Sequence, residues 1–252
     1  MATLSDKQIK AIESRIKDIS EVDQFIKILV YGQNGSEKTR FGASGPNAVI
    51  IDINEKGTKS ARGFAGTKVF SVRKWEDATY FMWYLRTAEH PYETVVIDNL
   101  TTLQQMCMTH VLKEAGDSDP NKDPAMASMR EWGKCTELIK PLLLHYRNLP
   151  MHVVFIAQER EIEEDDESTM HTPDMPRGTR GIATGAVDVI GRTYKKEVRV
   201  GKGKKERSIW EPRMLVGPHD EFITKDRTGK LGRIIRKPSV PKILEAAFGD
   251  EE

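Results

Sequence analysis

The sequence contains few cysteines and no long apolar run. Cys107 and Cys135 are the only cysteines among 252 residues, and they lack C-x-x-C spacing. This scarcity argues against a thiolate metal cluster and favours a reducing compartment, in which we expect two buried free thiols. No run approaches the roughly 20 apolar residues of a membrane span. Because no apolar segment follows the charged start "MATLSDKQIK", we expect no signal peptide and a location in the cytoplasm.

Two further kinds of site lack support in the sequence. The six histidines are scattered without a pair at metal-ligand spacing, so we expect no zinc site. The nucleophile pattern G-x-S-x-G is missing as well, which leaves Ser-His-Asp hydrolase chemistry unsupported. Trp75, Trp83 and Trp132 lie within helical patterns. We expect these tryptophans in the core rather than as platforms on which nucleic-acid bases stack.

Charge is balanced overall but unevenly distributed along the chain. The formal net charge is only +1, yet residues 192–237 hold 15 Lys and Arg against 6 Asp and Glu. The opposite sign is concentrated in "EIEEDDE", residues 161–167. A basic C-terminal third is typical of nucleic-acid binding, although charge runs more often form solvated faces. Charge alone therefore leaves both interpretations open.

Apolar segments that alternate with helical patterns predict an α/β fold with a mostly parallel central sheet and helices on both faces. We expect an N-terminal amphipathic helix within 1–24, whose apolar stripe continues to residue 27, and a core over 25–237. A β-hairpin extension follows within the core after a long polar loop that ends near residue 185, and 238–252 form a short tail. The expected strands are 25–32, 47–54, 67–72, 92–100 and 151–159, and the expected helices are 75–90, 101–115 and 129–148.

The stretch "GQNGSEKT", residues 32–39, is close to the phosphate-binding pattern G-x-x-x-x-G-K-[ST]. Its context supports the match, because an apolar strand precedes it and a helix is expected to follow. Backbone N–H groups of such a loop cradle phosphates, the lysine neutralises the β- and γ-phosphates, and the threonine hydroxyl ligates Mg²⁺. We therefore expect ATP and Mg²⁺ as ligands. The expected nucleotide-binding residues are Gly32, Gln33, Asn34, Gly35, Ser36, Glu37, Lys38, Thr39 and Arg40.

A second element of such a site follows at a suitable distance. "TVVIDNL" is an apolar strand that ends in Asp98, where a P-loop enzyme holds the carboxylate that orients magnesium through water. A strand-end aspartate can also simply cap the next helix. Together with Gly32, Lys38 and Thr39, the metal-orienting role is favoured, so Thr39 and Asp98 are the expected metal-binding pair.

Glu37 departs from the pattern, which has glycine before the lysine. Glycine there allows a close backbone approach and a conformation that a Cβ obstructs. A carboxylate also brings negative charge towards a polyanion. At about 4 Å and an effective dielectric constant of 20, such a contact costs on the order of 4 kcal/mol. We expect weakened nucleotide binding, unless the side chain turns outward.

The groups that assist hydrolysis are harder to assign. Ligands in parallel sheets bind at the carboxyl ends of the strands, and Asp52 and Glu55 both lie there in "IIDINEKG". Glu55 is our candidate for polarising the attacking water, although an ordinary surface glutamate fits the sequence equally well. Gln158, which ends "VVFIAQ", is our candidate sensor of the γ-phosphate.

These motifs together resemble the RecA-like ATPases, and in particular the short phage recombination ATPases of the Sak group. The resemblance covers residues 26–235 and rests on "GQNGSEKT", "TVVIDN", "VVFIAQE", "GAVDVIGR" and "TKDRTGKLG". The last stretch is similar to the K-x-R-x-G element of DnaB-type helicases and RadA, which reaches into a neighbouring subunit's site. The resemblance implies that Lys225 and Arg227 act in trans on the transferring phosphoryl group. A basic hairpin turn is the alternative interpretation.

A trans role implies an oligomer, either a ring or a filament, and the resemblance implies single-stranded DNA as a partner. Its DNA-binding loops correspond to residues 116–128 and 161–185, of which the second begins with acids that repel phosphate. Lys202, Lys204 and Lys205 add candidate backbone contacts, and a single-strand binding protein is a further candidate partner.

Three functions remain open at this point. The first is a DNA-dependent ATPase of recombination or strand annealing in the host cytoplasm. The second is a helicase or helicase loader on the same core. The third is a non-catalytic P-loop module that Glu37 has disabled.

Overall fold

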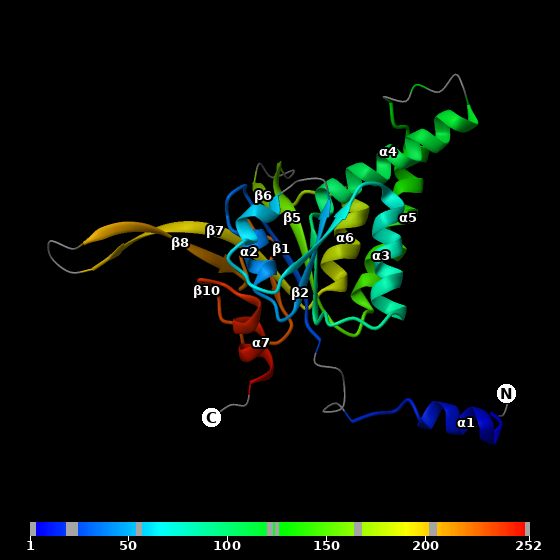
Figure 1. The fold of residues 1–252 in the computed structure, drawn as a ribbon, viewed down its shortest axis with the longest axis horizontal. Helices are drawn as coiled ribbons and strands as arrows, with labels where there is room; N and C mark the ends of the chain where they lie inside the picture. Colours follow the sequence, from blue (N-terminus) through cyan, green and yellow to red (C-terminus); the bar gives the residue numbers. More distant parts are fainter. Residues whose placement is uncertain are drawn as a thin grey trace.

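A mostly parallel sheet forms the centre of the molecule (Figure 1). The computed structural model describes residues 4–18, 25–53, 57–119, 123, 126–163, 168–201 and 206–249. The main path of the sheet runs β10-β8-β7-β1-β5-β4-β2-β3, with β6 paired to β5 and β9 to β7. Strands β7, β1, β5, β4, β2 and β3 are mutually parallel. Their bounds are β1 Lys27–Gly32, β2 Ala48–Ile53, β3 Lys68–Val72, β4 Thr94–Asp98, β5 His152–Glu163 and β7 Val189–Val200.

Each expected strand and the predicted fold class are confirmed. Strands β2 and β4 are buried along their whole length, and β1 is buried after its first residue, because helices cover both faces of the sheet. Alternate residues of β1 enter different clusters: Leu29 and Tyr31 pack on one face, and Ile28 and Val30 on the other. Because β1, β2, β4 and β5 run parallel, their carboxyl ends point towards the same edge of the sheet.

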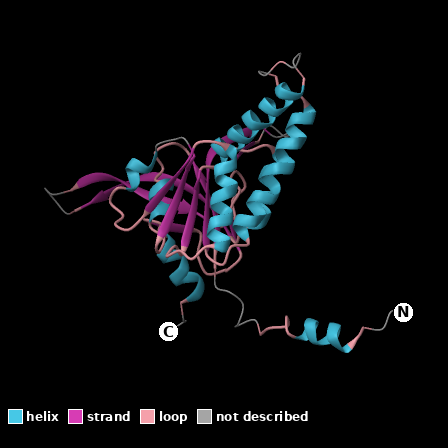
Figure 2. Cartoon of the chain, turned by 45° about the vertical axis from the view of Figure 1, so that its right-hand side comes forward, coloured by secondary structure: helices cyan, strands magenta, loops and turns pink. Residues whose placement is uncertain are grey.

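Two helical layers enclose the sheet (Figure 2). The larger layer packs against the face that carries Leu29 and Tyr31. It contains α3 Trp75–Thr87, α4 Leu100–Ser118, α5 Met129–Arg147 and α6 Arg177–Ala186. The opposite face is covered by α2 Lys38–Ala43, the 3-10 helix η2 Gly57–Ala61 and α7 Val240–Phe248.

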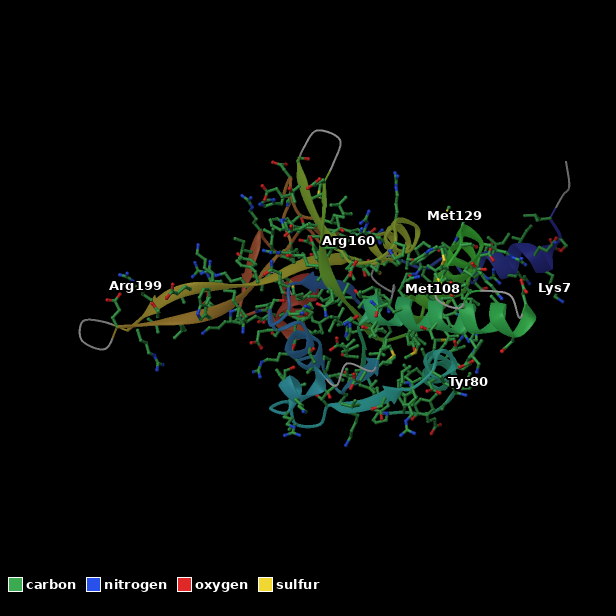
Figure 3. The ribbon with its side chains drawn as sticks, turned by 90° about the horizontal axis from the view of Figure 1, so that it is seen from above. Lys7, Tyr80, Met108, Met129, Arg160 and Arg199 are labelled. Carbon is green, nitrogen blue, oxygen red and sulfur yellow. The ribbon has the colours of Figure 1, made fainter. Side chains whose placement is uncertain are left out.

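An antiparallel ribbon extends from the edge of this core. It consists of β7 and β8 Arg207–Leu215, which pair from Arg192↔Leu215 to Val200↔Arg207. Figure 3 places Arg199 near the outer part of the ribbon, away from the body of the molecule. The expected hairpin is confirmed, and Lys202, Lys204 and Lys205 at its turn lie outside the described residues. The short strands β9 Lys225–Asp226 and β10 Ile234–Arg236 then pair with β7 and β8.

The N-terminal helix is much shorter than expected. Helix α1 spans only Asp6–Glu13, begins with a capping box between Ser5 and Gln8, and buries none of its residues. Ile9, Ile12 and Ile16 are all exposed. A helix this short that buries no apolar face gains little stability in water, so the expected continuation through residue 18 is wrong. The rest of the expected range, 19–24, lies outside the described residues.

The structure also corrects the interpretation of residues 161–185 as a loop. Strand β5 continues to Glu163, β6 spans Thr169–Pro173, and α6 begins at Arg177. The glycines and threonines of α6 favour helix weakly, but Thr179 and Ala183 are buried, so packing decides the conformation. The predicted tail carries α7, whose Val240 and Ile243 are buried in the second cluster.

The cysteine prediction is confirmed, whereas the tryptophan prediction is correct for one residue of three. Cys107 and Cys135 are buried free thiols. Trp75 is buried, but Trp83 and Trp132 are 45% and 40% exposed. Both exposed residues lie off the stripes with which α3 and α5 contact the sheet, since those stripes are formed by other positions.

Candidate nucleotide-binding site

The glycine loop joins the end of β1 to the start of α2. Strand β1 ends at Gly32 and α2 begins at Lys38. Gly32 is required by a close approach, because a Cβ there would lie 2.4 Å from the carbonyl oxygen of Thr193 on β7. Gly35 has a φ of 78°, a left-handed conformation that glycine adopts without strain. The loop thus has the backbone shape that its glycines predict.

Lys38 is held inside the loop. Its Nζ donates to the carbonyl oxygens of Gly32 and Gln33 at 2.7 and 2.9 Å, and to Oε1 of Gln158 at 3.1 Å. Gln158 pairs with Gly32 in the parallel register of β1 and β5. The structure therefore brings the expected phosphate-binding lysine and the expected γ-phosphate sensor into direct contact.

Thr39 and Asp98 also meet. The hydroxyl of Thr39, in the first turn of α2, donates to Oδ2 of Asp98 at 2.6 Å. Asp98 is the last residue of β4 and is buried. Hydroxyl and carboxylate oxygens are the ligands that Mg²⁺ prefers, so these two residues fit the ion. Asn99 caps α4 with its own side chain, which accepts from the N–H of Thr102 at 2.8 Å, so Asp98 is not the cap.

A cavity of about 320 Å³ lies over these groups. Its lining combines the loop with side chains from other strands and from η2. The lining residues are Asn34, Gly35, Ser36, Glu37, Lys38, Thr39, Gly57, Ser60, Asp98, Gln158 and Lys195. The lysine ammonium and the Thr39–Asp98 pair share this cavity, an arrangement that suits a polyphosphate with a bound cation.

A family model described as an AAA domain matches residues 24–228. The chain belongs to the AAA domain family. It is accordingly a P-loop NTPase of the nucleotide-binding ATPase class. A comparison with curated proteins found no match. Among the described residues, no helix combines the length and the apolar character that a membrane crossing requires.

Glu37 has a left-handed backbone conformation at the position where the P-loop pattern has glycine. Its φ of 75° and ψ of 23° are left-handed, which costs an L-residue roughly 1–2 kcal/mol. Its carboxylate is bound by two cations: Arg40 Nε lies 2.9 Å from Oε2 and Lys195 Nζ lies 2.8 Å from Oε1. The side chain is thus held by cations from α2 and β7, and the lost nucleotide affinity that we expect from Glu37 stays a prediction.

Arg40, the last of the expected nucleotide-binding residues, pairs with Glu37. Besides Glu37, it binds the carbonyl oxygen of Ser60 through Nη1 at 3.1 Å and lies over the ring of Phe64. Within this AAA domain it therefore links α2 to η2.

Of the two acidic residues at the end of β2 that could polarise water, the structure describes only Asp52. Glu55 lies outside the described residues, so its role stays a prediction. Asp52 is buried and pairs with Asp98 in the register of β2 and β4. It lines a different cavity of about 460 Å³, beside Thr58 and Arg62.

Lys225 and Arg227 lie away from the P-loop of their own chain. Lys225 pairs with Ile190 in β9 and β7, and Ile190 in turn pairs with Leu29, upstream of Gly32. Its Nζ donates to the carbonyl oxygens of Thr184 and Val187 at the end of α6. In this position Lys225 stabilises a helix end, as a cation there does.

Arg227 is more accessible than Lys225. Its side chain is 54% exposed and forms a 3.4 Å ion pair with Asp188. The register places both residues towards the start of β1, whereas the P-loop follows its end. The contacts of both residues lie at the end of α6 and at Asp188, and not at the glycine loop of the same chain. Their action on a neighbouring subunit stays a prediction.

Sequence reasoning missed Lys195 and Trp210. Lys195 belongs to a strand beyond the recognised motifs, and only the register of β7 beside β1 brings it to the loop. Trp210, on β8, is 66% exposed. Its position in the alternating, basic stretch "KKERSIWEP" was the available signal.

Proposed function

We propose that this AAA domain hydrolyses ATP as an oligomer on single-stranded DNA, in phage-type homologous recombination or strand annealing. The observation that carries the DNA part of this proposal is the projecting β7–β8 ribbon with its exposed aromatic side chain. Proteins that bind single-stranded nucleic acid use exposed aromatic side chains among cations, because bases stack on the rings while phosphates pair with the cations.

One face of the ribbon has this composition. Trp210 lies opposite Glu197, and Lys195 and Arg199 occupy the two flanking positions of β7 on the same face. Trp210 is the most exposed tryptophan among the described residues. The net basic charge of residues 192–237 adds long-range attraction for a polyanion. This face begins at Lys195, beside the glycine loop. DNA bound on the ribbon could therefore change the contacts of the loop with the nucleotide.

The ATPase part rests on the residues of the loop. Lys38 would neutralise phosphate charge and Gln158 would contact the terminal phosphate, while Thr39 and Asp98 would hold Mg²⁺. Bound there, Mg²⁺ supplies charge neutralisation for the transferring phosphoryl group. The chain's own contribution is to fix these oxygen and nitrogen atoms before ATP binds, which lowers the cost of reorganisation during the reaction.

The oligomer is proposed because of where Lys225 and Arg227 lie. Neither contacts its own glycine loop, and Arg227 is exposed. A head-to-tail assembly would bring that edge of one subunit to the P-loop of the next, and such contacts generate rings or helical filaments. Neither form is favoured by the described residues.

The test compares ATP hydrolysis with and without single-stranded DNA in the wild type, Trp210→Ala and the matched control Trp83→Ala. Trp83 is also an exposed tryptophan, but it lies on α3. We expect DNA to stimulate hydrolysis and Trp210→Ala to weaken DNA binding by about 5- to 150-fold, as the loss of one stacking contact does. The control should keep its DNA affinity, and binding should weaken with added salt.

Other outcomes separate the competing functions. Unwinding of a forked duplex without annealing of complementary strands would favour the helicase. ATP binding without hydrolysis, with or without DNA, would favour the non-catalytic module. Equal loss of DNA binding in Trp210→Ala and Trp83→Ala would contradict the role of the ribbon.

A further inference from the structure

Lys195 stands at the mouth of the nucleotide cavity without being part of any P-loop motif. It lies on β7, and its ammonium is 2.8 Å from Oε1 of Glu37, the residue directly before Lys38. Its side chain lines the 320 Å³ cavity together with Lys38, Asp98 and Gln158. It also lines a neighbouring cavity of about 320 Å³ between the loop and β7. A cation in this place is within a side-chain movement of the phosphates that Lys38 would bind.

Hydrogen bonds hold strand β7 next to the glycine loop, so the backbone of Lys195 stays close to the loop. Thr193 Oγ1 lies 2.8 Å from Ser36 Oγ and donates to the carbonyl oxygen of Tyr31 at 3.2 Å. Because strand residues alternate, Thr193 and Lys195 project from the same face of β7. Arg192, directly before Thr193, forms a bidentate ion pair with the buried carboxylate of Glu159 on β5.

The present partner of Lys195 is weaker than a nucleotide would be. The Glu37 carboxylate carries one negative charge and already has a second cation, Arg40. Both members of the Lys195–Glu37 pair are about one-third exposed, and such pairs contribute only about 0–1 kcal/mol. A triphosphate presents more charge and more acceptor oxygens to the same ammonium. Exchange of the carboxylate for phosphate would leave Glu37 paired with Arg40.

We propose that Lys195 is a phosphate-binding residue of the nucleotide site and that Glu37 competes with the phosphates of ATP for it. Glu37 then lowers affinity chiefly by occupying Lys195, and only in part by direct repulsion of phosphate. This proposal depends on ATP binding and not on single-stranded DNA, so it can fail or hold independently of the recombination function.

A double-mutant cycle distinguishes competition from simple screening. The affinity for a fluorescent ATP analogue with Mg²⁺, in the absence of DNA, is measured for the wild type, Glu37→Gln, Lys195→Met and the double variant. If Lys195 binds phosphate, Glu37→Gln tightens binding in the wild-type background and tightens it much less in Lys195→Met. If Lys195 only screens Glu37, the order reverses, because an unscreened carboxylate repels phosphate more strongly.

We expect Lys195→Met to weaken binding about 10-fold or more when Glu37 is already Gln, the loss typical of a hydrogen bond to a charged group. The matched control is Lys196→Met, an exposed lysine on the opposite face of the same strand, which should bind the analogue like the wild type. Thermal unfolding of all variants shows whether the fold is kept. Additive effects, a reversed order, or equal affinities of Glu37→Gln and the double variant would each overturn the proposal.

Discussion

The carboxylate of Glu37 is 2.8 Å from the ammonium of Lys195, although Glu37 follows β1 and Lys195 lies on β7, far along the chain. This contact converts an unfavourable charge in the phosphate loop into part of an ion-pair network with Arg40. The strain of the left-handed backbone remains, since the ion pairs act on the side chain only. The two effects of Glu37, on backbone and on charge, can therefore be measured separately.

Glu37→Gly and Glu37→Ala both remove the carboxylate, but only glycine removes the strain of a φ of 75°. We expect the alanine variant to be less stable than the glycine variant by about 1 kcal/mol, after allowance for the greater freedom of glycine in the unfolded chain. Urea denaturation followed by circular dichroism measures the difference. Equal stability of the two variants would mean that the loop relaxes when the ion pairs are lost.

Asp98→Asn should keep the fold and impair the use of Mg²⁺. The amide retains the shape of the carboxylate and an oxygen that can accept from Thr39, but it lacks the negative charge. We expect the apparent affinity for Mg²⁺ to fall by about 10- to 100-fold, the usual effect of losing a group that orients a metal's ligands. The measurement is ATP hydrolysis over a range of Mg²⁺ concentrations. Unchanged Mg²⁺ dependence would remove Asp98 from the site.

The trans role of Arg227 can be tested by mixing two inactive variants. Arg227→Ala should lose on the order of 10³-fold in hydrolysis rate if the residue acts as an arginine finger. Asp98→Asn subunits keep Arg227 but hydrolyse little ATP at their own sites when the Mg²⁺ concentration saturates only sites with an intact Asp98. In an equal random mixture, about one quarter of the interfaces join an intact site to an intact Arg227. Activity should therefore reappear on mixing, and its absence would argue against action in trans.

The stability of the protein should fall at mildly acidic pH because of His152. Its Nδ1 accepts from the N–H of Ile26 at 3.2 Å and so ties the start of β5 to the chain just before β1. Burial lowers the pKa of His152 below the ordinary 6.5, and the nearby Lys27 acts in the same direction. A histidine with a lowered folded pKa stabilises fully above the unfolded value, and this stability is lost as the pH falls through the folded pKa.

The measurement compares the free energy of unfolding of the wild type and His152→Asn between pH 7 and pH 5. Asparagine offers an acceptor near the position of Nδ1 and does not become protonated. The wild type should lose more stability than the variant over this range. Parallel curves would show that other groups account for the acid sensitivity.

The sequence by itself determined the local parts of the site. The glycines of the loop, the strand before it and the strand-final Asp98 each follow from short-range rules of turn geometry and hydrophobic patterning, so their positions were predictable. Residues 161–185 were not, because the helix-forming tendency of α6 is weak and the packing of Thr179 and Ala183 decides it. The predicted length of α1 was wrong for the opposite reason. Its apolar pattern favours a helix, but none of its residues is buried, so packing does not stabilise a longer one.

The tertiary structure alone decided which distant residues complete the site. Gln158 reaches Lys38 because β5 lies beside β1 in parallel register, and Lys195 reaches Glu37 because β7 lies on the other side of β1. Strand order and register depend on long-range packing of both sheet faces, which no local pattern encodes. The sequence thus determined a phosphate loop with an unfavourable glutamate. Only the position of the neighbouring strand β7 determined that Lys195 joins the local partner Arg40 in pairing with this glutamate.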